Sequence, residues 1–371
     1  MQNNKKKKSI VCVIGNLSSG GAEHQLLELS RLLYGKGYDV TIVTYLESGD
    51  FYEVPSYIHR VRIGLGKSKL KKAIGLMQFC FKQKNKVVIS YSQRTSCFVL
   101  SSLFFKRSTK VIASERNFTT GTPSVYEKWL MNLLYYRADY VVPNSYSQRN
   151  YILNKRGNWS SKVVTITNYT DLSKYKYSLQ PKNDLIRIGV FARYHFQKNY
   201  ERLAKAVNIL KDRTDKKFVI EWFGDKQMKE RELSADYIHF KEMVDGMNLS
   251  DYIHLNGRIL DVASKIQQFD VMCLPSLFEG FSNSISEYIC CGRPVLASDV
   301  SDNSVMVRNG ENGFLFDPHD EKSICDAFIK FFALTEEERE KMGSRSREIA
   351  EELFNEERFV EKYIELIEAP K

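Results

Sequence analysis

The chain has 371 residues, of which 43% are hydrophobic and 27% are charged, and its formal net charge is +10. This composition is typical of a globular protein, and the length is sufficient for two domains with a core each. No apolar run approaches the roughly 20 residues that a membrane-spanning helix needs, which argues against an integral membrane protein.

Basic residues are concentrated in the first half of the chain. Residues 1–180 hold 28 Lys and Arg against 10 Asp and Glu, a net charge of +18, whereas residues 181–371 hold 27 against 35, a net charge of −8. We therefore expect the first half to favour an anionic surface, which nucleic acid or acidic membrane lipid could supply. Four successive lysines at 5–8 favour a solvated tail over a membrane contact.

Seven cysteines occur without a C-x-x-C motif or a regular spacing, and most stand in apolar surroundings: Cys12, Cys80, Cys97, Cys273, Cys290, Cys291 and Cys325. This usage predicts free thiols in a reducing cytoplasm and argues against a disulfide framework or a zinc site.

The first strand is predicted at residues 9–15, followed by a loop with Gly20 and Gly21 and then by an amphipathic helix. By itself the glycine pair indicates no more than a tight turn. The loop is neither a P-loop nor the G-x-G-x-x-G of nicotinamide-dependent Rossmann enzymes, so a dehydrogenase is disfavoured.

A basic helix is predicted within residues 67–86, where Leu70, Ile74, Met77 and Phe81 recur at helical spacing among seven lysines. Such a helix can lie on an anionic bilayer, or it can be an ordinary helix of an α/β domain with a solvated lysine face. The charge of the first half favours the membrane. Further strands of this domain are predicted at 40–45, 87–91, 110–114 and 140–144.

Three polar residues follow the strand at 110–114, namely Glu115, Arg116 and Asn117. Polar side chains at the carboxyl ends of parallel strands face the ligand crevice, which makes these three candidates for acceptor binding. An ion pair of Glu115 and Arg116 with each other and their neighbours is the structural alternative.

Residues 171–184 are predicted as a linker, and residues 186–192 as the first strand of a second domain. Arg193 and Lys198 follow this strand, and Arg258 ends a later strand and turn at 254–258. In isolation each of these cations could be a surface residue.

Two glutamates, Glu279 and Glu287, stand eight positions apart in the stretch PSLFEGFSNSISEYICCGRPVLASD, residues 275–299. Apolar runs predict strands at 271–274 and 294–297, with a helix between them at 284–291 and Glu287 in its first turn. The S-I-S-E at 284–287 also fits a capping box, in which Glu287 would bond only to the helix cap. Backbone N–H groups near 283–286 would suit a diphosphate.

The same stretch closely resembles the E-x7-E signature of retaining GT-B glycosyltransferases, specifically of glycosyltransferase family 4. The resemblance implies an α/β protein with the GT-B fold, in which two Rossmann-like domains place their parallel sheets on either side of a deep cleft. Residues 1–175 would bind the acceptor and residues 183–354 the nucleotide sugar. A C-terminal helix at 355–371 would pack back on the first domain.

Residue roles carried over from the family give a catalytic set of Glu279, Arg193 and Lys198. Glu279 would contact sugar hydroxyls, Glu287 would contact ribose hydroxyls, and the two cations would hold the leaving diphosphate, whose growing charge they stabilise in the transition state. The expected donor-binding residues are Gly20, Gly21, Gly280, Phe281, Ser282, Asn283, Ser284, Glu287 and Arg258.

The chain departs from the family pattern at two places. Many members have a histidine near the segment that here reads Glu115 to Asn117, and the family's I-P-N-G-x-D segment is TITNYTD in this chain, with Thr167 and Tyr169 in place of Pro and Gly. The residue that faces the acceptor hydroxyl is therefore not identified from the sequence.

The resemblance implies transfer of a hexose or N-acetylhexosamine from a nucleotide sugar with retention of configuration. UDP is the expected nucleotide and GDP the alternative. No D-x-D occurs, so neither a metal ion nor a cofactor is expected. The expected acceptor is a lipid-linked saccharide of capsule, exopolysaccharide or O-antigen biosynthesis, with a soluble sugar as the alternative.

We accordingly expect a cytoplasmic enzyme that associates peripherally with the inner membrane through its basic first domain. The alternative to an enzyme is a basic nucleic-acid-binding protein. It is disfavoured, and nucleic acid is not an expected partner, because the chain lacks a helix-turn-helix, zinc or RNP-type motif.

Overall fold

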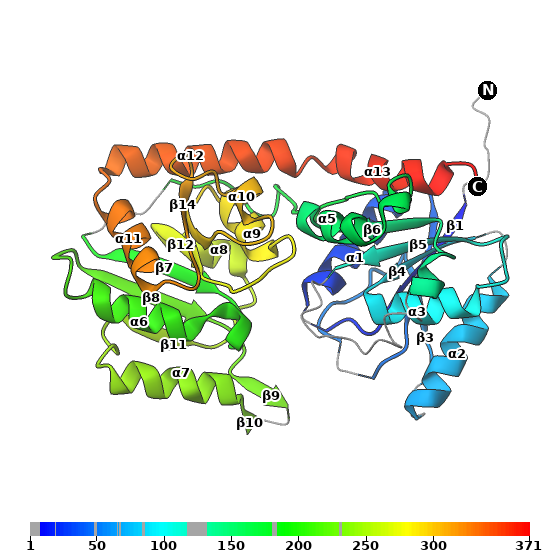
Figure 1. Ribbon diagram of the computed structural model, residues 1–371, viewed down its shortest axis with the longest axis horizontal. Helices are drawn as coiled ribbons and strands as arrows, with labels where there is room; N and C mark the ends of the chain where they lie inside the picture. The colour runs from blue at the N-terminus through cyan, green and yellow to red at the C-terminus, as the bar shows by residue number, and fades with distance from the viewer. Residues whose placement is uncertain are drawn as a thin grey trace. The chain divides into compact units, whose positions relative to one another are not determined.

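The computed structural model describes residues 8–18, 20–47, 50–64, 66, 68–83, 86–116, 132–179, 184–229 and 232–371. The chain divides into two compact units, Met1–Tyr169 together with Glu356–Lys371, and Thr170–Asn355 (Figure 1). Each unit is built around a six-stranded sheet in which every neighbouring pair of strands is parallel.

The first unit has the strand order β3-β2-β1-β4-β5-β6. Its strands are β1 (Ser9–Ile14), β2 (Asp39–Thr44), β3 (His59–Arg62), β4 (Val87–Tyr91), β5 (Lys110–Glu115) and β6 (Tyr140–Pro143). Its described helices are α1 (Gly21–Gly35), α2 (Lys69–Lys82), α3 (Gln93–Ser102), α5 (Tyr146–Lys155), the 3-10 turn Gly157–Trp159 and α13 (Glu356–Glu368). The inner strands are continuous apolar runs because both of their faces are covered.

The second unit repeats this topology with the order β11-β8-β7-β12-β13-β14. Its sheet strands are β7 (Ile186–Phe191), β8 (Phe218–Phe223), β11 (Ile253–Asn256), β12 (Val271–Leu274), β13 (Val295–Ser298) and β14 (Gly313–Phe316), beside a small hairpin of β9 (Gln227–Lys229) and β10 (Glu232–Leu233). Its helices are the 3-10 turn Phe196–Lys198, α6 (Tyr200–Leu210), α7 (Ala235–Gly246), α8 (Val262–Ile266), α9 (Asn283–Cys290), α10 (Asn303–Met306), α11 (Glu321–Phe332) and α12 (Glu336–Leu353).

Both sheets therefore have the doubly wound order of a Rossmann-like domain, and the predicted α/β fold of two such domains is confirmed. In each sheet the strand order reverses at the first strand, between β1 and β4 and between β7 and β12. The loops after these strands are where such sheets bind ligands. The edge strand β3 was missed, because its sequence HRVR has no apolar run.

Helix α13 packs on the first unit. Phe359 stacks on Tyr169 with ring centroids 5.3 Å apart, and the Lys110 ammonium group donates to the Leu366 carbonyl at 2.8 Å. The face of α13 that is buried in this unit consists of Phe359, Val360, Tyr363, Leu366 and Ile367. Burial of this stripe holds the chain's last helix on the unit in which the chain begins.

The first part of the segment predicted as a linker belongs to the second unit. The Arg293 guanidinium donates to the Ser178 carbonyl at 2.8 Å, and the Arg347 guanidinium donates to the Tyr175 carbonyl at 2.9 Å. Tyr175 is buried. Residues 170–179 are therefore held by specific contacts, which their polar sequence does not indicate.

Candidate functional site

The candidate site in the second unit lies at the carboxyl ends of β7 and β12, where the strand order reverses. Two loops meet there, residues 192–199 after β7 and residues 275–282 after β12. They are joined by hydrogen bonds from Leu277 N to the Gln197 carbonyl, 2.8 Å, and from the Gln197 amide to the Phe278 carbonyl, 2.8 Å. One hydrogen bond between backbone groups and one from the Gln197 side-chain Nε2 thus fix the two loops against each other.

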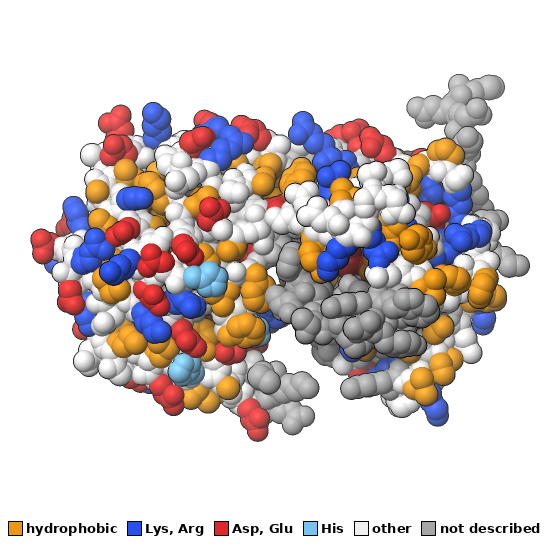
Figure 2. Space-filling view, viewed as in Figure 1, with side chains coloured by type: hydrophobic (Ala, Val, Ile, Leu, Met, Phe, Trp, Pro, Cys, Tyr) orange, Lys and Arg blue, Asp and Glu red, His pale blue; other side chains and the backbone are white. Residues whose placement is uncertain are grey.

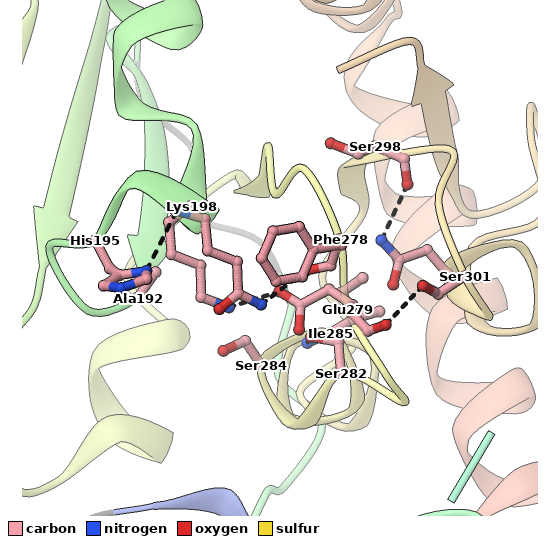
Figure 3. Close-up of polar contacts among 12 residues, drawn as sticks. Ala192, His195, Lys198, Phe278, Glu279, Ser282, Ser284, Ile285, Ser298 and Ser301 are labelled. Carbon is pink, nitrogen blue, oxygen red and sulfur yellow. Dashed lines mark hydrogen bonds and ion pairs between the residues drawn. The ribbon is translucent and has the colours of Figure 1, made fainter. Parts of the chain in front are cut away.

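An ion pair between Lys198 and Glu279 is the centre of this site (Figure 3). The Nζ–Oε1 distance is 2.5 Å, and the two side chains are only 13% and 10% exposed. The Ser301 hydroxyl donates to the Glu279 carbonyl at 2.6 Å and holds the loop from the other side. The structure therefore brings together two of the three residues predicted to be catalytic.

Arg193 is the third residue predicted to be catalytic. Its side chain is exposed and makes no hydrogen bond or ion pair within the described ranges. Burial lowers the pKa of the neighbouring His195, and the positive charges of Arg193 and Lys198 lower it further against the opposing effect of Asp236. The His195 Nδ1 accepts a hydrogen bond from Gln197 N at 3.3 Å, which requires the unprotonated nitrogen. Both predicted cations thus lower the pKa of one ring, which favours the neutral imidazole.

Glu287 does not form a capping box, so this interpretation of S-I-S-E is wrong. Helix α9 begins at Asn283, one residue earlier than predicted, and its N-cap is Ser282, whose hydroxyl accepts from Ile285 N at 3.4 Å. Glu287 is the fifth residue of the helix and lies beyond its first turn, because Ser282 takes the capping role that was assigned to Ser284.

The carboxyl group of Glu287 instead meets the Tyr175 hydroxyl, which donates a hydrogen bond to it. Burial raises the pKa of Glu287 to about 7, and this hydrogen bond together with the charge of Lys174 offsets only part of the effect. A half-buried carboxyl group of this kind is typical of a binding site. Tyr175 is a site residue that sequence reasoning missed, because it stands in the predicted linker.

The other predicted donor residues of the second unit have different surroundings. Phe281 is buried and makes an edge-on contact with Phe354, with centroids 6.3 Å apart, so its ring anchors the loop. The Ser284 hydroxyl donates to the Phe191 carbonyl at 2.9 Å, at the end of β7. Gly280 and Asn283 are half-buried beside them, and Arg258 is exposed in the loop after β11. The N-terminus of α9, where the Ser282 hydroxyl caps Ile285 N, has the partial positive charge that suits an anion.

Gly20 and Gly21 lie in the first unit at the beginning of α1, with Gly20 as its N-cap. The Glu23 carboxylate, from the first turn of this helix, lies against Gly20 and accepts from the Ser18 hydroxyl at 3.2 Å. A carboxylate at a helix N-terminus is electrostatically favoured. A phosphate approaching Gly20 would have to displace it.

Arg116 is buried beneath α13 with four hydrogen-bond partners in the first unit. Its guanidinium donates to Ser114 Oγ at 2.8 Å, Asn168 Oδ1 at 3.0 Å and the hydroxyls of Tyr91 and Tyr363. An acceptor role for Arg116 would require these contacts to be exchanged. Asn117 lies outside the described residues.

Glu115 is buried at the end of β5, where the Tyr135 hydroxyl donates to it. Burial raises the pKa of Glu115 to about 7, opposed by the Tyr135 hydrogen bond and the Arg116 charge. Glu115 and Arg116 therefore have separate partners, and both side chains hold the fold of the first unit.

Glu115→Gln is expected to change how stability depends on pH. The folded pKa of about 7 exceeds the ordinary value of 4.5, so folding retains a proton that the unfolded chain releases, and wild-type stability falls as pH rises through this window. The amide cannot ionise. The variant's melting temperature should therefore rise relative to wild type between about pH 5 and 8, by roughly 2 to 3 kcal/mol of stability or several degrees.

The control for this experiment is Glu348→Gln, which changes an exposed carboxylate on α12. Melting curves recorded by circular dichroism across the pH range should show a constant difference for this control. The same constant difference for Glu115→Gln would contradict the buried, proton-retaining state of Glu115.

Within the described ranges, no group of three or more His, Cys, Asp or Glu side chains is placed to hold a metal ion. None of the described helices has the length and apolarity that crossing a membrane requires.

Comparison with known proteins gives two family matches. The model described as "Glycosyltransferase Family 4" matches residues 19–174, and the model described as "Glycosyl transferases group 1" matches residues 184–333. The family 4 match lies almost entirely in the first unit, and the group 1 match lies in the second unit.

Two curated relatives align with this chain over most of their length. An uncharacterized glycosyltransferase of Methanocaldococcus jannaschii is 23% identical over 292 residues, 73% of this chain and 71% of the relative. N-acetylgalactosamine-N,N'-diacetylbacillosaminyl-diphospho-undecaprenol 4-alpha-N-acetylgalactosaminyltransferase of Campylobacter jejuni is 24% identical over 336 residues, 84% of this chain and 86% of the relative. Among solved structures, Anabaena HepE in complex with UDP-glucose superposes with a TM-score of 0.79 at 18% identity, over 97% of this chain and 99% of the other.

The doubly wound sheets and these matches define a glycosyltransferase with the GT-B fold. The chain belongs to glycosyltransferase family 4.

Proposed function

We propose that this enzyme moves a hexose or N-acetylhexosamine from a UDP-sugar to a lipid-linked saccharide, with retention of anomeric configuration and without a metal ion. The observation that carries the donor half of the proposal is the nearly buried Lys198–Glu279 pair at the carboxyl ends of β7 and β12. The UDP-glucose complex of HepE and the diphospho-undecaprenol named for the Campylobacter relative support the choice of donor and acceptor.

Lys198 and the exposed Arg193 are the groups that would receive the donor diphosphate. Cleavage of the glycosyl–phosphate bond increases the negative charge on the leaving oxygen, and cations fixed nearby stabilise that charge more in the transition state than in the ground state. In the structure the ammonium group of Lys198 is held by Glu279. The pair therefore orients the cation before the donor enters.

The two glutamates would bind the two ends of the donor. Glu279, beside Lys198, would accept hydrogen bonds from sugar hydroxyls, and Glu287, beside Tyr175, would accept them from the ribose. A carboxylate is suited to both roles because each of its oxygens can accept a hydrogen bond from a hydroxyl group. The raised pKa of Glu287 means that its accepting, ionised form increases as pH rises through about 7.

The reaction itself is proposed as a front-face displacement. The bond between the anomeric carbon and the phosphate oxygen breaks while a bond to the acceptor oxygen forms on the same face, and the departing phosphate oxygen takes the acceptor proton. This route retains configuration without an enzyme nucleophile, and Glu279, the carboxylate at the centre of the site, is already paired with Lys198.

The proposed acceptor is supported by the relatives and by the positive charge of the first half of the chain. A lipid-linked saccharide of capsule, exopolysaccharide or O-antigen synthesis would bring the enzyme to the cytoplasmic face of a membrane as a peripheral protein. The alternatives are a GDP-sugar donor and a soluble sugar acceptor.

Thermal stabilisation by nucleotide sugars tests the donor site. A UDP-sugar at 100 times its dissociation constant is expected to add about 2.7 kcal/mol of stability, a clear rise in melting temperature. UDP-glucose, UDP-N-acetylgalactosamine and GDP-mannose form a sufficient panel. Glu287→Gln should reduce the rise, because the amide has one acceptor oxygen for hydroxyl hydrogen bonds where the carboxylate has two.

The matched control is Glu311→Gln, an exposed carboxylate near β14, which should leave the rise unchanged. A rise with GDP-mannose alone would replace UDP by GDP in the proposal. No rise with any of the three sugars would count against nucleotide-sugar binding at this site.

A further inference from the structure

The outer face of α2 and the turn after α3 form one surface of the first unit that combines apolar and basic side chains. We call it the α2 surface, and it consists of Leu70, Lys71, Ile74, Phe81, Lys82, Phe105, Lys106 and Arg107. In Figure 2, hydrophobic and basic side chains are both visible over this part of the unit.

The apolar side chains of the α2 surface point away from the core. Phe105 is 94% exposed, Leu70 70%, Phe81 59% and Ile74 45%. The opposite face of α2 supplies the core contacts, through residues such as Leu76 and Cys80, which are fully buried. An ordinary helix of an α/β domain shows polar residues on its outer face. The outer face of α2 instead carries three large apolar residues, Leu70, Ile74 and Phe81.

Basic groups surround these apolar side chains. Lys71, Lys82 and Arg107 are exposed, and the Lys106 ammonium lies 4.7 Å from the centre of the Phe81 ring while it donates to the Phe81 carbonyl. Lys106 thereby joins the turn after α3 to the end of α2. At this end of α2 a basic and an apolar side chain are therefore in direct contact.

Acidic residues are absent from the whole surrounding sequence. Residues 54–114 contain 13 Lys and Arg and not one Asp or Glu. A second copy of the chain pressed against this surface would bring like charges together. Charge complementarity instead points to an anionic partner, and the exposed apolar side chains require that partner to have an apolar layer as well.

We propose that the α2 surface docks on an anionic lipid bilayer. Leu70, Ile74, Phe81 and Phe105 would enter the boundary between headgroups and acyl chains, and the neighbouring cations would contact lipid phosphates. The inference deepens the proposed function, since it names the surface through which the enzyme would reach a lipid-linked acceptor. The docking itself does not depend on the identity of the donor.

Sedimentation of the full chain with lipid vesicles tests the proposal. Vesicles of phosphatidylcholine with phosphatidylglycerol are expected to bind the protein at least about tenfold more tightly than vesicles of phosphatidylcholine alone, and added salt should weaken that binding. The double variant Leu70→Ser with Phe105→Ser should lose about tenfold or more in affinity, although both residues lie outside the core. Lys71→Glu with Lys82→Glu should reduce binding further.

The matched control is Leu260→Ser, which removes a side chain that is 83% exposed on the second unit and should leave vesicle binding unchanged. Thermal stabilisation by UDP-sugars, measured on the same samples, separates this inference from the proposed function. Absence of vesicle binding in a protein that still responds to UDP-sugar would overturn the docking surface and leave the donor site standing.

Three further results would also overturn the α2 surface as a membrane contact. One is unchanged vesicle binding by the Leu70 and Phe105 double variant. Another is self-association of the wild type on gel filtration that the same variant abolishes, which would make the surface an interface between copies. The third is binding to duplex DNA in place of vesicles.

Discussion

Lys198→Met is expected to lower the rate constant of sugar transfer about 100- to 1,000-fold, the usual effect of removing one group that stabilises developing charge. Methionine keeps much of the side-chain volume but lacks the ammonium group, so the leaving diphosphate loses a cation and Glu279 loses its partner at 2.5 Å. Steady-state measurement of released UDP would follow the change. The loss should fall mainly on kcat, because the charge develops in the transition state.

Lys205→Met provides the control for this prediction. Lys205 lies on α6 of the same unit and is exposed, and its side chain makes no hydrogen bond or ion pair within the described part of the chain. Its variant should transfer sugar at the wild-type rate. If Lys198→Met also did so while remaining folded, Lys198 could not be the group that holds the diphosphate.

Arg293→Met is expected to destabilise the second unit by about 3 kcal/mol or more. The Arg293 side chain is fully buried and donates to the Ser178 carbonyl at 2.8 Å, the Gln267 carbonyl at 3.0 Å and the Leu179 carbonyl at 3.1 Å. These carbonyls are only partly buried, so the loss of each hydrogen bond costs about 1 kcal/mol, the usual net contribution of such a bond. Methionine can fill the space, but it cannot donate to any of these carbonyls.

Arg308→Met is the matched comparison for stability. Arg308 forms an ion pair with Glu352 at 2.6 Å, but both side chains are largely accessible to solvent, and exposed pairs contribute about 1 kcal/mol or less. Urea unfolding of both variants, followed by circular dichroism, measures the difference. Equal unfolding midpoints for the two variants would contradict the anchoring role of Arg293.

The strands of both sheets could be predicted because a strand covered on both faces must be apolar throughout. β1, β4, β7 and β12 all follow this rule, and each was expected within a residue or so of its observed bounds. The edge strand β3 and the hairpin of β9 and β10 were missed. Their residues alternate or are polar, so pairing with neighbours rather than composition defines them.

The site was predicted in part. Lys198 and Glu279 were named from the resemblance to family 4, and the structure places them in contact. The roles of these two residues in donor binding and catalysis stay predictions. The partners of Glu115 and Arg116 could not be anticipated, because Tyr135 and Tyr363 reach them from segments that local sequence patterns do not connect.

By itself the sequence determined the class of fold and the family, and it predicted the two loops that form the candidate site, because apolar runs, glycine positions and the E-x7-E stretch are all local features. Only the tertiary structure decided that Glu287 meets Tyr175 instead of capping α9, and that Leu70, Ile74 and Phe81 face outward. Helical spacing places residues on one face of a helix, but the packing of the whole chain decides whether that face meets the core or the solvent.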